Sequence, residues 1–127
     1  MTFFFDNNLS HYIPKALKIF GQDACHLKDH FPVNAPDIDW LPFLAENSMA
    51  LITLDLRITK NPLEVKLLKK YNIKTFFLEG KTLSAWQRVV QVFRAWEEIK
   101  NKASKRRPPH IFKVVPKGTR VYPPEQL

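Results

Sequence analysis

Four aspartates stand at positions from which acidic side chains could share one metal ion. Two of them each follow a predicted strand and two open a predicted helix; they are Asp6, Asp55, Asp37 and Asp39. Carboxylates gathered at one place raise each other's pKa, and a divalent cation removes that penalty. A few hard oxygen ligands, completed by water, suit Mg²⁺ or Mn²⁺ better than Zn²⁺. An ion held in this way lowers the pKa of a bound water and orients it for attack on a phosphorus atom.

Each of these aspartates also has an ordinary structural explanation, which the sequence leaves open. Asp6 suits a helix N-cap or an Asx turn at a strand end, and Asp55 suits a turn before a loop. Asp37 and Asp39 are favourably placed in a first helical turn, where the helix dipole attracts negative charge. Residues two apart on a helix point in different directions, so one of this pair at most faces a shared site. The coincidence of all four at one predicted edge favours the metal site.

The aspartates meet only if strands and helices alternate along the chain. Apolar runs predict strands at 2–5, 23–27, 50–54, 74–78 and 111–115, with an edge strand or tail at 120–122. Helical spacing predicts helices at 9–20, 36–47, 61–71 and from 84 to about 100, fading out by 107. This alternation predicts an α/β fold of three layers, α/β/α, with a mostly parallel central sheet of about five strands. Ligands of such sheets bind beyond the carboxyl ends of the strands, which is where Asp6 and Asp55 are expected.

Cap residues and prolines mark the predicted helix boundaries. Pro36 suits the first position of a helix, whereas Pro42 inside the same helix predicts either a kink or a later start. Residues 61–64 and 84–87 each have the residue types of a capping box. The apolar stripe of the last helix is expected to include Trp86 and Trp96, which favours burial in the core over a dimer interface.

The bulk composition bounds the class of protein. With 127 residues, 45% of them hydrophobic, the chain is expected to form a single domain over residues 1–127. No apolar run approaches 18 residues and no leader pattern precedes the first strand, so a cytoplasmic location without membrane contact is expected. The single cysteine, Cys25, fits a reducing compartment. The four histidines lack zinc spacing, and three glycines are too few for the common phosphate-binding loops.

Charge is distributed unevenly along the chain. Residues 1–60 hold five Lys or Arg and seven Asp or Glu, whereas residues 61–127 hold fifteen and five. A polyanionic partner such as nucleic acid would bind to the basic half, and the cluster that includes Arg106 and Arg107 could contact phosphates without regard to sequence. The alternative is that this cluster is a solvated helix end that matches the helix dipole.

The order and spacing of these motifs resemble a known family. "FFFDNNLS", then "APDID" opening a helix, then "ALITLD", followed by "RITKNPLE" and "IKTFFLEG", are similar to the PIN-like domain, in particular its compact VapC-type toxin branch, over residues 2 to about 80. The resemblance implies a Mg²⁺- or Mn²⁺-dependent ribonuclease that acts on RNA. Such proteins are usually the toxin of a type II toxin–antitoxin pair, inhibited by a cognate antitoxin protein and often a homodimer.

The resemblance also implies roles for individual residues. Asp6, Asp37 and Asp55 would be the metal-binding and catalytic acids, with Asn8 beside them and Asp39 as the substitute for Asp37 if the helix register differs. Relatives often carry another acid two residues after the third aspartate, where this chain has Arg57. Arg57 or Lys60 could instead hold the scissile phosphate, and Tyr12 and Trp40 are the aromatic residues that could receive an antitoxin segment. Core packing is favoured for Trp40.

Two other functions remain compatible with the residues. The first is a catalytically incomplete PIN-like module that binds RNA or a partner, which Arg57 favours. The second is a receiver-like signalling domain, which also places acids after its first and third strands. A receiver needs an aspartate pair at the first strand, whereas residues 7 and 8 here are asparagines and the isoelectric point is near 9.8.

Overall fold

A single mixed sheet forms the centre of the molecule. The computed structural model describes residues 1–55 and 61–124, and within these ranges six strands pair in the order β2-β1-β3-β4-β5-β6. The strands are β1 (Thr2–Phe5), β2 (Ala24–His26), β3 (Met49–Thr53), β4 (Thr75–Leu78), β5 (Ile111–Val114) and β6 (Val121–Tyr122). The first five are mutually parallel, and β6 pairs antiparallel with β5. The predicted α/β class is confirmed, and the segment at 120–122 is a sixth strand at the edge.

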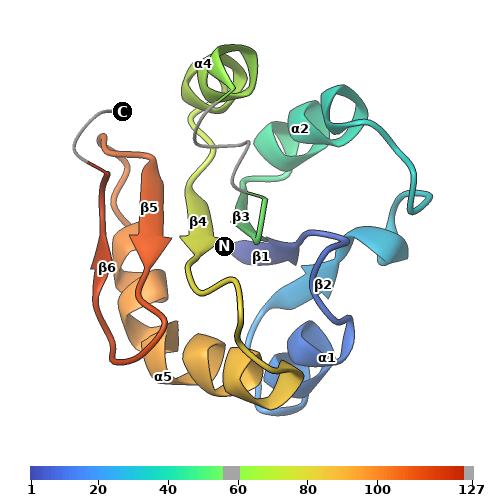
Figure 1. Ribbon diagram of the computed structural model, residues 1–127. Coiled ribbons are helices and arrows are strands. Elements are labelled where there is room, and N and C mark those ends of the chain that lie inside the picture. The colour runs from blue at the N-terminus through green and yellow to red at the C-terminus, as the bar shows by residue number, and fades with distance from the viewer. Residues whose placement is uncertain (56–60, 125–127) are drawn as a thin grey trace.

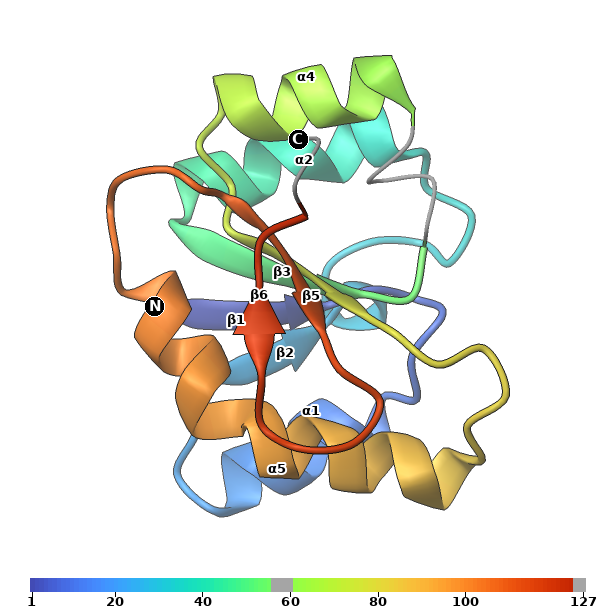
Figure 2. The ribbon, with the colours of Figure 1, turned by 60° about the vertical axis from the view of Figure 1, so that its left-hand side comes forward.

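Helices cover both faces of this sheet and give three layers. The described helices are α1 (Tyr12–Ile19), α2 (Asp37–Glu46), α4 (Pro62–Lys70), α5 (Ala85–Ala103) and the short 3₁₀ helix η1 (Leu27–Asp29). Figures 1 and 2 show α1 and α5 side by side on one face and α2 and α4 on the other. None of the helices in the described part of the chain is long and apolar enough to cross a membrane.

Successive side chains of β1 point to opposite faces of the sheet and pack into two separate hydrophobic cores. Phe3 and Phe5 point to the α1–α5 face, where the ring centroid of Phe3 lies 4.7 Å from that of Trp96. Phe4 points to the α2–α4 face and stacks on Trp40 at 5.6 Å. Burying a large apolar side chain of this kind contributes about 1.5–3 kcal/mol. The run "FFF" is therefore explained by a strand that is covered on both faces.

Several predicted boundaries differ from the structure by one to three residues. Helix α1 begins at Tyr12 rather than at residue 9, because residues 6–10 form a turn in which the Leu9 N–H donates to the Asp6 carbonyl at 3.0 Å. Pro36 is the N-cap of α2 rather than its first residue, and Pro42 lies inside α2 without ending it. The central strand ends at Thr53, so Asp55 is not the first residue after it.

The N-caps of α4 and α5 lie at the first residues of the two predicted capping boxes. Ser84 and Gln87 form the expected capping box of α5, while α4 is capped by Asn61, whose side chain accepts from the Leu63 N–H at 3.0 Å. The predicted apolar stripe of α5 is confirmed at Trp96, which is buried together with Val92, and is wrong at Trp86, which is 73% exposed.

The topology assigns the elements to two opposite edges of the sheet. Helices α2 and α4 each lead into a parallel strand, so both begin at the edge where β1 and β3 end. Helix α5 also leads into a parallel strand, and its C-terminal end lies at the other edge, beside the start of the chain in Figure 2. We call the first edge the carboxyl edge and the second the amino edge.

Candidate active site

Asp6 is the centre of the acidic site at the carboxyl edge. It directly follows β1, its side chain is only 9% exposed, and its backbone N–H continues the sheet by donating to the Ile52 carbonyl at 2.9 Å. Its Oδ1 accepts the Asn7 N–H at 2.6 Å and its Oδ2 accepts the Thr53 hydroxyl at 2.8 Å. A buried carboxylate with only these neutral donors is poorly solvated.

These surroundings shift the pKa of Asp6. Burial raises its pKa above the ordinary value of 3.8, whereas the hydrogen bonds from Thr53 and Asn7 lower it. The negative charges of Asp37 and Asp55 raise it further, and the net effect is a raised pKa. The charges of Asp37 and Asp55 thus both act on the Asp6 carboxyl, as repulsion between like charges at one edge of the sheet requires.

Thr53 ties the ends of two strands together. Its hydroxyl donates to Asp6, accepts the Asp55 N–H at 3.0 Å and accepts the Asn8 side-chain amide at 3.4 Å. The Asn8 Oδ1 in turn accepts the Leu54 N–H at 3.2 Å. One donor and two acceptor positions are all that a hydroxyl offers, so Thr53 is fully used in holding the site.

Sequence reasoning did not identify Thr53 as part of the site. Thr53 belongs to the apolar run at 50–54, and nothing in its sequence neighbourhood marks it as a site residue. The signal is the strand register: Phe5 pairs with Ile52, so the residues that follow them, Asp6 and Thr53, stand next to one another. The register is a property of the paired strands and cannot be read from the sequence of either strand alone.

The two aspartates of α2 have different surroundings. Asp37 is the first helical residue, is half-buried and contributes to the raised pKa of Asp6. Asp39 is exposed and is not among the groups that perturb Asp6. The structure thus brings Asp37 rather than Asp39 toward the acidic site. Asp55 is half-buried at the same edge, and the predicted phosphate contacts Arg57 and Lys60 lie outside the described residues.

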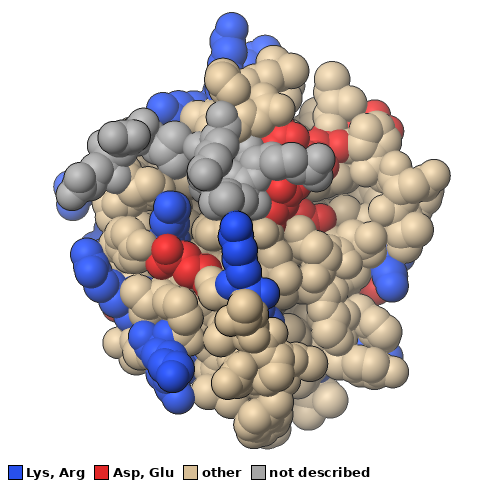
Figure 3. Space-filling model, in the orientation of Figure 1, with Lys and Arg blue, Asp and Glu red and all other residues tan. Residues whose placement is uncertain are grey.

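A further carboxylate stands at this edge. Glu64 is half-buried in the first turn of α4, a helix that begins at the carboxyl edge. The sequence had suggested only a capping role for Glu64. In Figure 3, acidic side chains gather on the face toward the viewer, near the position of α2 in Figure 1.

The donor types at the carboxyl edge fit a hard divalent cation. Carboxylate and amide oxygens are the ligands that Mg²⁺ and Mn²⁺ prefer. The side-chain oxygen of Asn7, next to Asp6, is buried and has no hydrogen-bond partner among the described residues. Within the described ranges, however, no three His, Cys, Asp or Glu side chains lie close enough to hold an ion between them. Binding would therefore draw the carboxylates together around Asp6.

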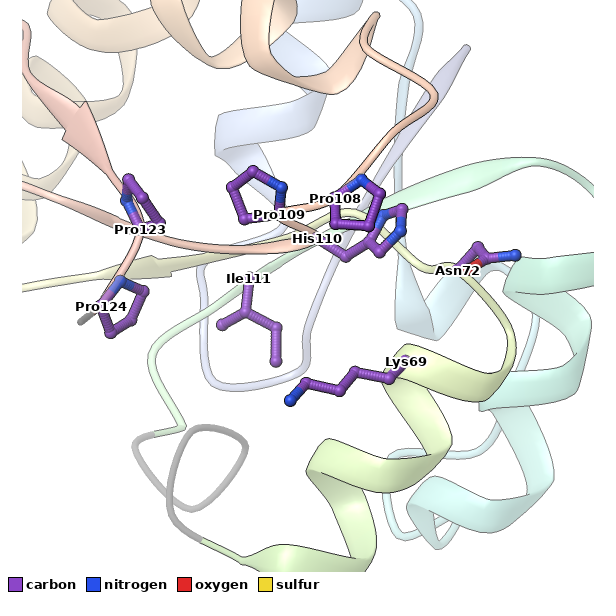
Figure 4. Close-up of a pocket in the computed structure, with 8 residues that line it drawn as sticks. All are labelled: Lys69, Asn72, Pro108, Pro109, His110, Ile111, Pro123 and Pro124. Carbon is purple, nitrogen blue, oxygen red and sulfur yellow. The ribbon is translucent and has the colours of Figure 1, made fainter. Parts of the chain in front are cut away.

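The structure does not bring Arg106 and Arg107 to the acidic site. They follow α5 at the amino edge, where Arg106 lines a cavity of about 610 Å³ together with Met1 and Met49 at the starts of two strands. The Arg107 carbonyl accepts a hydrogen bond from the Nζ of the buried Lys74 at 2.8 Å. An adjoining cavity of about 540 Å³ between His110 and the neighbouring prolines is shown in Figure 4. These arginines are candidates only for a phosphate contact remote from the acids.

Comparison with known proteins agrees with the observed fold. Residues 1–80 match the family model described as PIN like domain, which covers the chain from β1 to the end of β4. The chain therefore belongs to the PIN-like domain family. No curated protein and no solved structure matches it. PIN-like domains are generally nucleases and typically use divalent metals, and the match gives no support to the receiver-like alternative.

Proposed function

We propose that this protein is a Mg²⁺- or Mn²⁺-dependent endoribonuclease, with Asp6, Asp37 and Asp55 as the metal-binding acids. The observation that carries the proposal is the Asp6 carboxylate, whose pKa is raised chiefly by burial and further by the charges of Asp37 and Asp55. Two strand ends and a helix start, far apart in the sequence, bring these acids to one edge. Negative charges that act on a buried carboxylate in this way are unfavourable unless a cation neutralises them.

The chain's own residues would prepare this site for a phosphodiester. A bound divalent ion would supply a Lewis acid and a water of lowered pKa. Each oxygen of Asp6 accepts one hydrogen bond and keeps a second lone pair for a ligand, and Thr53 and Asn7 fix its orientation. The Asn8 amide is held by Thr53 and Leu54, which leaves one N–H to donate to a phosphate oxygen. Arg57 and Lys60 are proposed to neutralise that phosphate.

Cleavage of a fluorogenic single-stranded RNA tests the proposal. Wild-type protein should cleave in Mn²⁺ or Mg²⁺ and stop in EDTA. Asp6→Asn should lower the rate by roughly 100-fold or more, which is the order of effect expected when a group that stabilises developing charge is removed. Undiminished cleavage by this variant would refute the assignment.

The two acids of α2 provide a matched pair for the same assay. Asp37→Asn should lose cleavage because Asp37 is half-buried and its charge acts on Asp6, whereas Asp39→Asn should stay close to wild type because Asp39 is exposed. Both substitutions remove one negative charge from the same helical turn, so the effect on the helix dipole is shared. Equal losses in the two variants would contradict the placement of Asp37 as the ligand.

The biological role follows from the VapC-type resemblance. We propose that the protein is the toxin of a type II toxin–antitoxin pair, acting in the cytoplasm as one domain over residues 1–127 and bound by a cognate antitoxin, with a homodimer as its assembly. The single domain is supported by α5, which packs on β1 through Phe3 and Trp96 although it lies beyond the family match. A small neighbouring reading frame that encodes a DNA-binding protein would support the toxin role.

A second function is favoured by one observation. Among the described residues the carboxylates do not form a ready three-ligand cluster, which would suit a catalytically incomplete module that binds RNA or a partner. Titration calorimetry with Mn²⁺ separates the two. A nuclease should bind the ion and lose that binding on Asp55→Asn, whereas the incomplete module should bind no ion.

A further inference from the structure

An open groove lies next to the acidic site on the α1–α5 face. It has a volume of about 680 Å³ and runs between α1 and the first turn of α5. Its floor includes Leu9 and Ile13, which also belong to the core. We call this space the α1–α5 groove. Its size is within the range of small-ligand sites, about 300–1,000 Å³.

The groove begins where the acidic site ends. Asn8 and Leu54 line it, and these two residues are joined by the hydrogen bond from the Leu54 N–H to the Asn8 Oδ1. The Asn8 amide reaches the Thr53 hydroxyl, which donates to Asp6. A chain whose phosphate sits at Asp6 would therefore lead a neighbouring residue of that chain directly into the groove.

Two exposed aromatic rings line this groove. Tyr12 at the start of α1 is 67% exposed, and Trp86 in the first turn of α5 is 73% exposed. Neither ring is needed to fill the core, because the core positions of α5 are held by residues such as Val92 and Trp96. Exposed aromatics around one hollow mark a binding site. Aromatic rings are the usual platforms on which unpaired bases stack.

The charged residues that line the groove favour an anionic ligand. None of the residues that line it, all of which lie in the described part of the chain, is an Asp or a Glu, whereas Lys81 and Arg88 are both present. The Arg88 guanidinium donates to the Glu79 carbonyl at 2.9 Å and to the Gln91 side chain at 2.7 Å. Arg88 therefore joins α5 to the segment after β4 and is already hydrogen-bonded within the protein. The exposed Lys81 remains as the cation available to a phosphate.

We propose that the α1–α5 groove binds an unpaired nucleotide of the RNA next to the scissile phosphate, with its base stacked on Trp86 or Tyr12 and its phosphate near Lys81. The inference rests on the proposed function for the position of the scissile phosphate. Continuity with the acidic site through Asn8 and a positive, carboxylate-free lining both favour a nucleotide over an apolar protein segment. The groove would thus determine which unpaired base is accepted.

Binding can be measured without cleavage by working in EDTA. A single-stranded 10-mer RNA carrying 2-aminopurine should lose fluorescence on binding to wild-type protein, because the base stacks on an aromatic ring. Trp86→Ala and Tyr12→Ala should each weaken binding by about 10-fold, a loss typical of one base–aromatic stack, and should reduce the quenching. Phe20→Ala is the matched control, because Phe20 is equally exposed at 74% but lies at the far end of α1, outside the groove.

The outcomes separate this inference from the proposed function. Metal-dependent cleavage with KM raised in Trp86→Ala and unchanged in Phe20→Ala supports both. Cleavage with the same KM in all three proteins overturns the groove assignment and leaves the nuclease intact. Quenching that depends on Trp86 without any metal-dependent cleavage supports the groove and overturns the nuclease. A wild-type dimer that Trp86→Ala converts to monomer, with unchanged RNA affinity, shows that a second copy occupies the groove and overturns the inference.

Discussion

The raised pKa of Asp6 makes the stability of the fold depend on pH in a way that can be measured. In the unfolded chain this carboxyl titrates near 3.8, whereas in the folded protein its pKa is raised, chiefly by burial. Between these two pKa values the folded state binds more protons than the unfolded state. The free energy of unfolding therefore falls as pH rises from about 4 through the raised pKa, and then becomes level.

The perturbation is Asp6→Asn, which removes the titrating group and keeps the shape of the side chain. Asn retains one oxygen as an acceptor, but its amide faces the Thr53 hydroxyl, so a pH-independent loss of about 1 kcal/mol is expected. The pH dependence is a separate quantity. One carboxyl with a raised pKa changes the free energy of unfolding by at most about 1.4 kcal/mol per pH unit within its window. In a domain of this size that corresponds to roughly 5 °C in Tm per pH unit.

The assay is urea unfolding followed by circular dichroism at a series of pH values from 4 to 8, without divalent metal. The difference in free energy of unfolding, wild type minus Asp6→Asn, cancels the other titrating groups and should decrease as pH rises. Asp39→Asn is the control, because Asp39 is exposed and does not perturb Asp6. Adding Mn²⁺ at pH 7.5 should stabilise the wild type and not Asp6→Asn. Parallel pH profiles for wild type and Asp6→Asn would show that Asp6 is an ordinary solvated carboxylate and would refute the reasoning.

Three further predictions test the core and the buried polar groups. Trp40→Ala should destabilise the fold by about 3–5 kcal/mol in urea unfolding, because Trp40 is 1% exposed and stacks on Phe4, whereas Trp86→Ala should change stability by less than about 0.5 kcal/mol. Lys74→Met should cost about 1–2 kcal/mol in the same assay, because it removes the donor of two part-buried hydrogen bonds to the backbone carbonyls of Arg107 and Pro109. Burial and two nearby aspartates raise the pKa of the Cys25 thiol to about 11, so its reaction with a disulfide reagent at pH 8 should be far slower than that of the unfolded chain; equal rates would contradict this.

Much of the fold could be predicted because its signals are local. Alternation of apolar runs with helical spacing specified the order of strands and helices, and Ser84 marked the start of α5 as its capping box requires. The boundaries that were wrong depend on contacts that the local pattern does not contain. Helix α1 begins after residue 9 because the Leu9 N–H donates to the Asp6 carbonyl and forms a turn there. Trp86 lies outside the core because packing against β1, as between Trp96 and Phe3, determines which side of α5 is buried.

For the candidate site, the sequence by itself determined which residues could act: Asp6 and Asp55 near strand ends, Asp37 and Asp39 in one helical turn, and a resemblance that joins them. Only the tertiary structure decided how they are arranged. It half-buried Asp37 so that its charge acts on Asp6, it left Asp39 in solvent, it placed Thr53 beside Asp6 at the strand ends, and it placed Arg106 at the opposite edge. The physical reason is that residue type and spacing fix the chemistry and the local element, whereas strand register and helix direction fix which groups become neighbours.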